Sequence, residues 1–517
     1  WDELLQKDEM GHLLRKMENT VDGDFQNLAA STGNYIRENF FGPENELKKL
    51  VEHLDDKSLT KLRRGGHDST KIFAAYKEAT EHKGQPTVVL AKTVKGWALG
   101  KGFEARNMTH QKKSLEKSDW QYFRDLLEIP FTDSELENMP YYKPASDSEE
   151  IQYLREQREK LGGYLPTRKE SYSGFHMPKK DVFSEFDKGT PKEQEVSTTM
   201  AFVRLLRNLL KDEKIGDLVV PIVPDEARTF GMEALFTEFK IYNAQGQIYT
   251  PVDSQLLLSY KESESGQILE EGISEAGAMS SFTAAGMAYS TVGKPTIPFY
   301  IYYSMFGFQR VGDQIWCAAD SRAKGFLLGA TAGRTTLNGE GLQHQDGHSL
   351  LTATTVPNCL SYDAAFAYEI GIIIKEGLRR MYENNEDVFY YLTLYNENYP
   401  MPALPKNSEE GIIKGIYKFK STTTPQIRLI GSGPIMQQVL KAEKILSDLG
   451  IKSEIWSATS FGGLRRDAIE CERWNMLNPS KKQKIPYISK TIGKNDIITI
   501  AATDHMKAVP DMIKNWM

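Results

Sequence analysis

The stretch Gly266–Ser290, GQILEEGISEAGAMSSFTAAGMAYS, places one carboxylate, Glu275, directly before a run of small side chains. Glycine in a helix costs roughly 1 kcal/mol relative to alanine, so this run suits a helix that approaches another backbone or a flat ligand closely. A glutamate that opens such a helix is expected in a tightly packed, poorly solvated place, which favours a protonated carboxyl. That environment suits a catalytic acid, although a glutamate that only complements the helix dipole fits the pattern as well.

Around this stretch, strand-like and helix-like segments alternate from residue 195 to residue 398. The expected strands are DLVVPIVPDEA (217–227), KPTIPFYIYYSMF (294–306), GFLLGATAG (325–333) and DVFYYLTLYNENY (387–399). Such alternation predicts an α/β domain, with a parallel sheet covered by helices on both faces. We place this domain at residues 195–400.

A second α/β unit is expected at residues 405–517, around the strands IRLIGSGP, IKSEIWSA and DIITIAATD. The GSG triplet after the first of these strands resembles a phosphate-binding turn, but a tight strand-to-helix turn explains it equally. Before residue 195 the pattern differs. Residues 1–83 read as helices, and Pro86–Gly96 reads as a buried strand followed by a Gly-rich loop at 97–114. Residues 115–194 are polar and read as a linker.

The composition narrows the class of protein. With 517 residues, 40% hydrophobic and 26% charged, the chain is long enough for several globular domains. The net charge of −6 argues against a nucleic-acid-binding surface, and no uncharged apolar run reaches the ~18 residues of a membrane span. Three widely spaced cysteines are expected as reduced thiols in a cytoplasmic protein. Because both ends fall within helical patterns, we expect a piece of a longer protein.

Chemistry-bearing residues gather at or after the ends of the expected strands, where open α/β sheets bind ligands. They are Asp225 and Glu226, Glu275, the aromatic run Tyr302–Phe306, and His344 within GLQHQDGHS. An aromatic face beside a glutamate suits a flat nitrogen heterocycle, which can stack on the ring and hydrogen-bond the carboxylate. Two alternatives stay open: the aromatic side chains form core, or His344 and His348 bind a metal with Asp346 between them, although the nearest further soft ligand, Cys359, lies outside this loop.

Five longer strings resemble one known family. PDEARTFGMEALF, QILEEGISEAGA, PFYIYYSMFGFQRVGD, GRTTLNGEGLQHQDGHS and CERWNMLNP are similar to the first, decarboxylating component of the homodimeric bacterial pyruvate dehydrogenase. The resemblance implies a thiamine-diphosphate-binding fold with a truncated transketolase C-terminal-like domain. It further implies a Mg²⁺-dependent homodimer that oxidatively decarboxylates pyruvate. The acetyl group would pass to the lipoyl domain of dihydrolipoamide acetyltransferase.

The resemblance also implies roles for single residues. Glu275 matches the glutamate that hydrogen-bonds the aminopyrimidine ring of the cofactor, and Phe306 matches the aromatic residue that stacks on it. Tyr303 lies beside the expected substrate pocket, and His344 matches a histidine that faces pyruvate.

Further implied roles fall outside this group. His110 matches a histidine linked to acetyl transfer, in the mobile loop 97–114 that also contains Glu104. Asp225 and Glu226 match acidic residues near the cofactor and the subunit interface.

One family feature is missing. Enzymes of this kind hold the diphosphate through Mg²⁺ on a GDG motif, and no GDG occurs in this sequence. Residues 1–114 therefore correspond to the last part of the diphosphate-binding domain, and 195–400 to the pyrimidine-binding domain. We expect no metal site in this chain, weak cofactor binding and an inactive fragment. A transketolase-type transferase and a non-catalytic subunit are the competing hypotheses.

Overall fold

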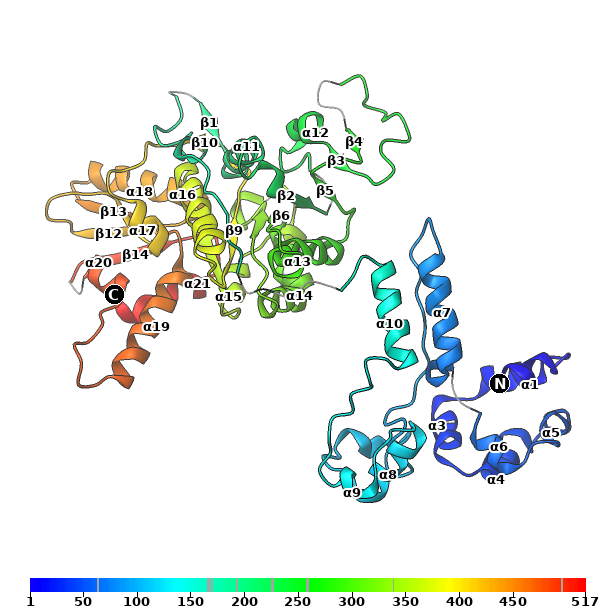
Figure 1. Cartoon of the computed structure of the whole chain (residues 1–517). Helices are drawn as coiled ribbons and strands as arrows, with labels where there is room; N and C mark the ends of the chain where they lie inside the picture. Colours follow the sequence, from blue (N-terminus) through cyan, green and yellow to red (C-terminus); the bar gives the residue numbers. More distant parts are fainter. Residues whose placement is uncertain are drawn as a thin grey trace. The chain divides into compact units, whose positions relative to one another are not determined.

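The computed structural model describes residues 1–62, 65–164, 169, 171–191, 194–224, 227–256, 260–337, 339–493 and 496–517. The chain forms two compact units, Trp1–Tyr164 and Leu165–Met517, which are described separately (Figure 1). The sequence-based boundaries near residues 114, 194 and 400 stay predictions.

The first unit is helical. Trp1, Phe40 and Phe41 pack together at ring-centre distances of 4.9–6.2 Å and form part of its small core. Its longest helix, Ser69–Glu81, is capped by Asp68, whose side chain accepts a hydrogen bond from Lys71 N over 3.1 Å. The elements are α1 Asp2–Gln6, α2 His12–Asn19, α3 Asp22–Ala30, α4 Gly33–Ile36, η1 Arg37–Phe41, α5 Asn45–Val51, α6 Asp56–Thr60, η2 Gly65–His67, α7 Ser69–Glu81, η3 Asn107–His110, α8 Lys117–Leu126, α9 Asp133–Leu136 and α10 Glu149–Lys160.

The strand predicted at Pro86–Gly96 is wrong. This segment forms no strand, and Val88 and Leu90 are 79% and 92% exposed. A strand requires a neighbour that pairs with its N–H and C=O groups, and the described residues 1–62 and 65–164 contain no strand.

The second unit is built on a six-stranded sheet in the order β5-β2-β6-β7-β9-β8, in which every neighbouring pair is parallel. The strands are β2 Val219–Val223, β5 Leu269–Glu270, β6 Ile297–Tyr303, β7 Phe326–Ala330, β8 Cys359–Asp363 and β9 Phe389–Thr393. The predicted parallel α/β sheet is confirmed. Sequence analysis missed β8, because Ser361 and Asp363 interrupt its short apolar run.

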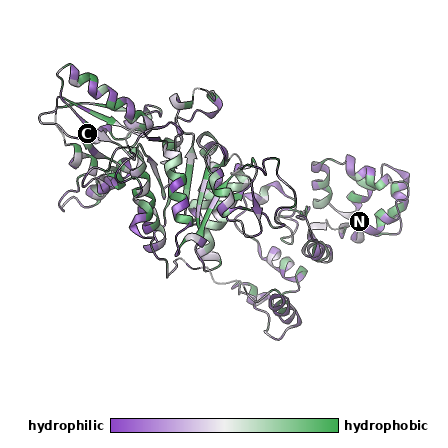
Figure 2. Ribbon diagram, turned by 90° about the horizontal axis from the view of Figure 1, so that it is seen from above, coloured by the Kyte–Doolittle hydropathy of each residue, from purple (hydrophilic) through white to green (hydrophobic). Residues whose placement is uncertain are grey.

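Helices cover both faces of this sheet. On β6, the ring of Phe299 packs 5.8 Å from that of Phe202 in α11 (Thr198–Leu210). The next residue, Tyr300, hydrogen-bonds the backbone oxygen of Glu275 in α13 (Glu275–Thr291) over 3.2 Å. Successive side chains of a strand point to opposite faces, so α11 and α13 lie on opposite sides of the sheet (Figure 1). The strands between them are mostly hydrophobic (Figure 2).

A smaller sheet of order β11-β13-β12-β14 follows, with β11 antiparallel to β13 and the other pairs parallel. Its strands are β11 Tyr417–Lys420, β12 Ile427–Gly431, β13 Ser453–Ser457 and β14 Ile498–Ala502. Besides α11 and α13, the α-helices around both sheets are α12 Glu233–Phe239, α14 Phe308–Asp320, α15 Ser349–Ala353, α16 Ala367–Leu378, α17 Glu409–Lys414, α18 Met436–Asp448, α19 Phe461–Leu477, α20 Tyr487–Ile492 and α21 Ala508–Asp511. Within the described ranges, no helix has the length and apolarity needed to cross a membrane.

Candidate active site

Glu275 is the first residue of α13, and its backbone oxygen accepts a hydrogen bond from Tyr300 of β6. The side chain of Ser274 caps the helix by accepting a hydrogen bond from Gly277 N over 3.1 Å. Glu275 is only 8% exposed, so the buried position predicted for this carboxylate is confirmed.

The small residues of α13 allow a close backbone approach, as their pattern predicts. Lys324 N donates to the backbone oxygen of Gly286 over 3.0 Å. A Cβ atom at Gly286 would lie 2.6 Å from the Lys324 oxygen, which real Cβ atoms do not tolerate. Glycine at this position therefore lets α13 contact the turn before β7.

Arg310 joins the carboxylate to the aromatic run. Its Nη1 donates to Glu275 Oε1 over 2.9 Å, and its guanidinium carbon lies 3.8 Å from the centre of the Phe306 ring. Sequence analysis missed this partner, because Arg310 and Glu275 are 35 positions apart and belong to different helices. The buried carboxylate thus has a cation beside it.

Tyr303, Phe306 and His344 form one cluster. The imidazole of His344 lies 5.0 Å from the ring centre of Tyr303 and 5.3 Å from that of Phe306, and the latter two rings are 5.9 Å apart. Tyr303 ends β6, Phe306 lies in the turn η6 (Ser304–Phe306), and His344 lies in the turn η8 (Leu342–His344). His344 Nδ1 is buried with no hydrogen-bond partner among the described residues. Four sequence-predicted residues, Glu275 included, are therefore brought together.

The metal alternative receives no support from this geometry. Asp346 is buried, accepts hydrogen bonds from Ser349 N and His348 N over 3.0 Å, and contacts the hydroxyls of Ser304 and Ser349. Across the described part of the chain, no three His, Cys, Asp or Glu side chains come together as a metal site requires. Burial raises the pKa of Asp346, but the charge of His505 and the hydroxyl hydrogen bonds outweigh burial and lower it. Asp346 organises the loop that bears His344.

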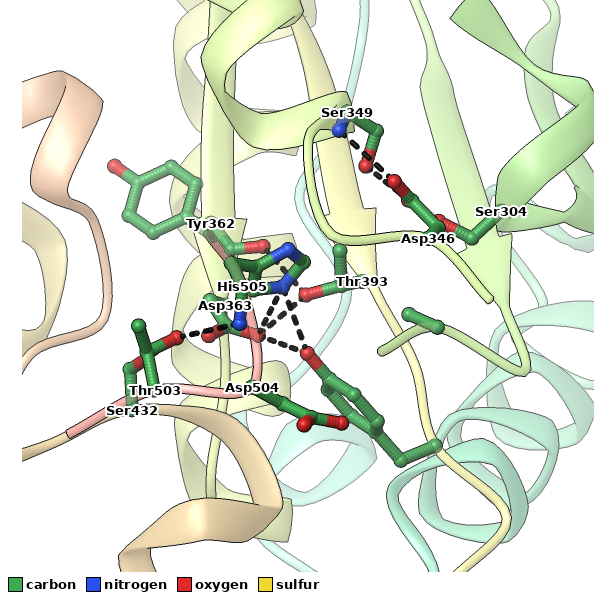
Figure 3. Close-up of polar contacts among 12 residues, drawn as sticks. Ser304, Asp346, Ser349, Tyr362, Asp363, Thr393, Ser432, Thr503, Asp504 and His505 are labelled. Carbon is green, nitrogen blue, oxygen red and sulfur yellow. Dashed lines mark hydrogen bonds and ion pairs between the residues drawn. The ribbon is translucent and has the colours of Figure 1, made fainter. Parts of the chain in front are cut away.

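A second buried polar group lies nearby (Figure 3). Asp363, at the end of β8, accepts hydrogen bonds from Thr393 Oγ1 over 2.7 Å and from the Tyr395 hydroxyl over 2.5 Å. Its Oδ1 lies 3.8 Å from Nε2 of His505, which follows β14. Burial lowers the pKa of His505, but the hydrogen bond and charge of Asp363 outweigh burial and raise it. No local pattern indicates this group, because its members are distant along the chain.

This group also decides between the two interpretations of the GSG turn, Gly431-Ser432-Gly433. Gly433 has a φ of +50°, and a Cβ atom there would lie 2.9 Å from Asp363 Oδ1 and 3.0 Å from the Tyr395 hydroxyl. A carboxylate against the turn repels phosphate, so the tight strand-to-helix turn is the better interpretation.

Comparisons with known proteins agree with this arrangement. Residues 177–402 match the model of the pyruvate dehydrogenase E1 component middle domain, and residues 415–515 match the transketolase-like C-terminal domain. The whole chain is 50% identical to the pyruvate dehydrogenase E1 component of Pseudomonas aeruginosa and 49% identical to that of Escherichia coli. The chain belongs to the pyruvate dehydrogenase E1 component family. It spans 59% and 58% of the length of these two relatives.

Solved structures support the fold of this family member. A transketolase from Campylobacter jejuni is 15% identical with a TM-score of 0.55, over 91% of this chain and 63% of that one. A transketolase from Pichia stipitis is 16% identical with the same TM-score, over 87% of this chain and 63% of that one. At these identities the similarity shows the transketolase-like fold alone, as expected from the sequence.

Four further residues are assigned to the family site by resemblance alone: Asp225, Glu226, His110 and Glu104. Asp225 and Glu226 lie outside the described residues. His110 and Glu104 belong to the first unit, where His110 Nδ1 lies 2.8 Å from Lys95 Nζ and Glu104 Oε1 accepts from Ala98 N over 2.7 Å. Their roles, and the mobility of the loop 97–114, stay predictions.

Proposed function

We propose that this chain contributes the pyrimidine-binding half of a thiamine-diphosphate-dependent pyruvate dehydrogenase. The whole protein would oxidatively decarboxylate pyruvate and acetylate a lipoyl group. The observation that carries the proposal is the cluster of Tyr303, Phe306 and His344 beside the buried Glu275. Identity of about 50% over the entire chain to proteins named pyruvate dehydrogenase E1 component supports it.

The contacts of Arg310 indicate that these residues fit an aminopyrimidine. The guanidinium is planar and carries N–H donors, one of which hydrogen-bonds Glu275, and its carbon atom lies over the Phe306 ring. An aminopyrimidine is also planar and also carries N–H donors, so it would satisfy the same carboxylate and the same ring. Arg310 is 51% exposed, which leaves its side chain free to yield that place.

Each of the site residues would then have a defined role in the reaction. Bound thiamine diphosphate supplies a carbon nucleophile for the oxo group of pyruvate. Glu275 would hold the pyrimidine by a hydrogen bond and share a proton with its ring nitrogen. His344 and Tyr303 would orient pyruvate. In the first unit, His110 would act in acetyl transfer, and closure of the loop 97–114 would exclude water.

The diphosphate half of the site is not assigned to this chain. We propose that Mg²⁺ is bound outside the sequence described here, so that this chain alone binds thiamine diphosphate weakly. A cofactor held by its pyrimidine alone lacks the charge-assisted contacts of the diphosphate with Mg²⁺. Tight, Mg²⁺-dependent binding to this chain in calorimetry would contradict the proposal.

The proposed partners are pyruvate, a second copy of the whole protein, and the lipoyl domain of dihydrolipoamide acetyltransferase. The deciding experiment measures pyruvate decarboxylation with an artificial electron acceptor, thiamine diphosphate and Mg²⁺. It compares this chain with a protein extended upstream to include a GDG-bearing domain. Activity in the extended protein alone supports the proposal, and inactivity of both favours a non-catalytic subunit. Turnover of sugar phosphates instead of pyruvate would indicate a transketolase-type transferase.

A further inference from the structure

The loop that bears His344 closes on itself at a narrow neck. We define the His344 loop as residues 333–337 and 339–348, between β7 and α15. At the neck, Asp346 N donates to the Gly333 oxygen over 2.9 Å. The side chain of Arg334 lies against Gly347, where a Cβ atom would be 2.9 Å from Arg334 Cδ. The position of His344 therefore depends on how this neck is held.

Asp504, which follows β14 in the smaller sheet, binds the beginning of the loop. Its carboxylate accepts hydrogen bonds from Arg334 N over 2.7 Å, from Thr335 N over 3.0 Å and from Thr335 Oγ1 over 2.7 Å. The carboxylate is buried and fills the space beside Gly333, where a Cβ atom would lie 2.3 Å from Asp504 Oδ2. Two backbone donors and one hydroxyl of the loop thus depend on this single side chain.

The backbone next to Asp504 binds the rest of the neck. Arg334 donates from Nε to the Asp504 oxygen over 2.9 Å and from Nη2 to the His505 oxygen over 3.1 Å. Met506 N donates to the Gly347 oxygen over 2.8 Å. Figure 3 shows Asp504 and His505 on the C-terminal segment and Asp346 on the loop opposite. The segment Asp504–Met506 therefore contacts both ends of the neck.

We propose that Asp504 is a positioning residue of the active site, which sets the place of His344 through the neck of the His344 loop. The proposal rests on the proposed function, in which His344 faces pyruvate. Without the carboxylate, the backbone N–H groups of Arg334 and Thr335 lose their acceptor, which destabilises this arrangement of the neck. A displacement of about 1 Å at a reacting group can reduce catalysis by about 100-fold.

The first test measures the neck itself and needs no activity. Hydrogen exchange would be compared in the chain and in its variants Asp504→Ala and Asp504→Asn, with Asp511→Asn as the control in the same C-terminal segment. We expect the amides of Thr335 and Asp346 to exchange about 10-fold or more faster in Asp504→Ala, since their protection reports local opening. The strand β12 and the control should keep the wild-type rates. Unchanged exchange at Thr335 and Asp346 overturns the proposal.

The variant Asp504→Asn distinguishes a local effect on the loop from a general folding defect. If β12 also exchanges faster in Asp504→Ala, Asp504→Asn decides, because the amide keeps one acceptor oxygen. Faster exchange confined to the loop in Asp504→Asn supports the proposal. Equal acceleration in the loop and β12 shows a general structural role and overturns it.

The second test uses the protein that is extended upstream to include a GDG-bearing domain. Asp504→Asn is expected to raise the KM for pyruvate by about 10-fold while the Kd of thiamine diphosphate changes by less than about 2-fold. A residue with a general structural role would weaken both equally. If the wild-type extended protein is inactive, the proposed function fails, and the exchange experiment still decides whether Asp504 holds the loop.

Discussion

The variant Arg310→Ala tests the connection between the buried carboxylate and the aromatic cluster. Arg310 makes two contacts that the substitution removes together: the ion pair with Glu275 at 2.9 Å and the cation–π contact with Phe306 at 3.8 Å. The Glu275 side chain is 11% exposed, so in the variant this carboxylate stays mostly shielded from water and has lost its cation. We expect a measurable loss of stability.

The size of the loss follows from the exposure of Arg310. Because its side chain is 51% exposed, the ion pair is screened and contributes about 0.2–1 kcal/mol. The stacking of the cation on Phe306 contributes about 0.5–1 kcal/mol at such a site. Together they predict a decrease of about 0.7–2 kcal/mol in the free energy of unfolding.

The assay is urea unfolding of the chain, followed by circular dichroism, with Arg207→Ala as the matched control. Arg207 pairs with Glu238 at the same 2.9 Å and is also 51% exposed. Its partner is more exposed, at 33%, so the control variant should lose at most about 1 kcal/mol. A double-mutant cycle of Arg310→Ala with Glu275→Gln isolates the pair. A loss in Arg310→Ala no larger than in Arg207→Ala, with additive double-mutant effects, would refute the reasoning.

Three more predictions concern the buried group of Asp363, Tyr395 and His505 and the turn beside it. Tyr395→Phe removes the hydroxyl that donates to Asp363 over 2.5 Å and should lower the free energy of unfolding by about 1.5–3 kcal/mol in urea titrations; a loss below about 0.5 kcal/mol contradicts this. Gly433→Ala, with its φ of +50° and blocked Cβ position, should lower the thermal midpoint, whereas Gly312→Ala, with open space around it in α14, should not; equal midpoints would be inconsistent with the tight turn. Because the pKa of His505 is raised, its stabilising charge is fully present below the ordinary value of 6.5 and is lost as pH rises through the raised pKa. His505→Gln should remove this part of the pH dependence, and an unchanged slope above pH 6.5 would argue against it.

Several features of the chain could be predicted from local sequence because local physics decides them. Alternating apolar strands and amphipathic helices predict the parallel sheet, since a buried strand needs helices on both faces. The small residues of α13 predict a close approach, which occurs at Gly286. The burial of Glu275 follows from the same pattern. Where a segment needs a distant partner, local pattern fails: the apolar run Pro86–Gly96 forms no strand, because the described residues 1–62 and 65–164 contain no strand to pair with it.

The sequence alone thus determined the fold class, the buried carboxylate and the residues that meet in the aromatic cluster. Only the tertiary structure decided what holds them. Arg310 reaches Glu275 from another helix, and Asp504 reaches Thr335 across 169 positions of the chain. The hydrogen-bond partner of a carboxylate cannot be predicted from the sequence, because a hydrogen bond depends on a distance of about 3 Å in space and not on separation along the chain.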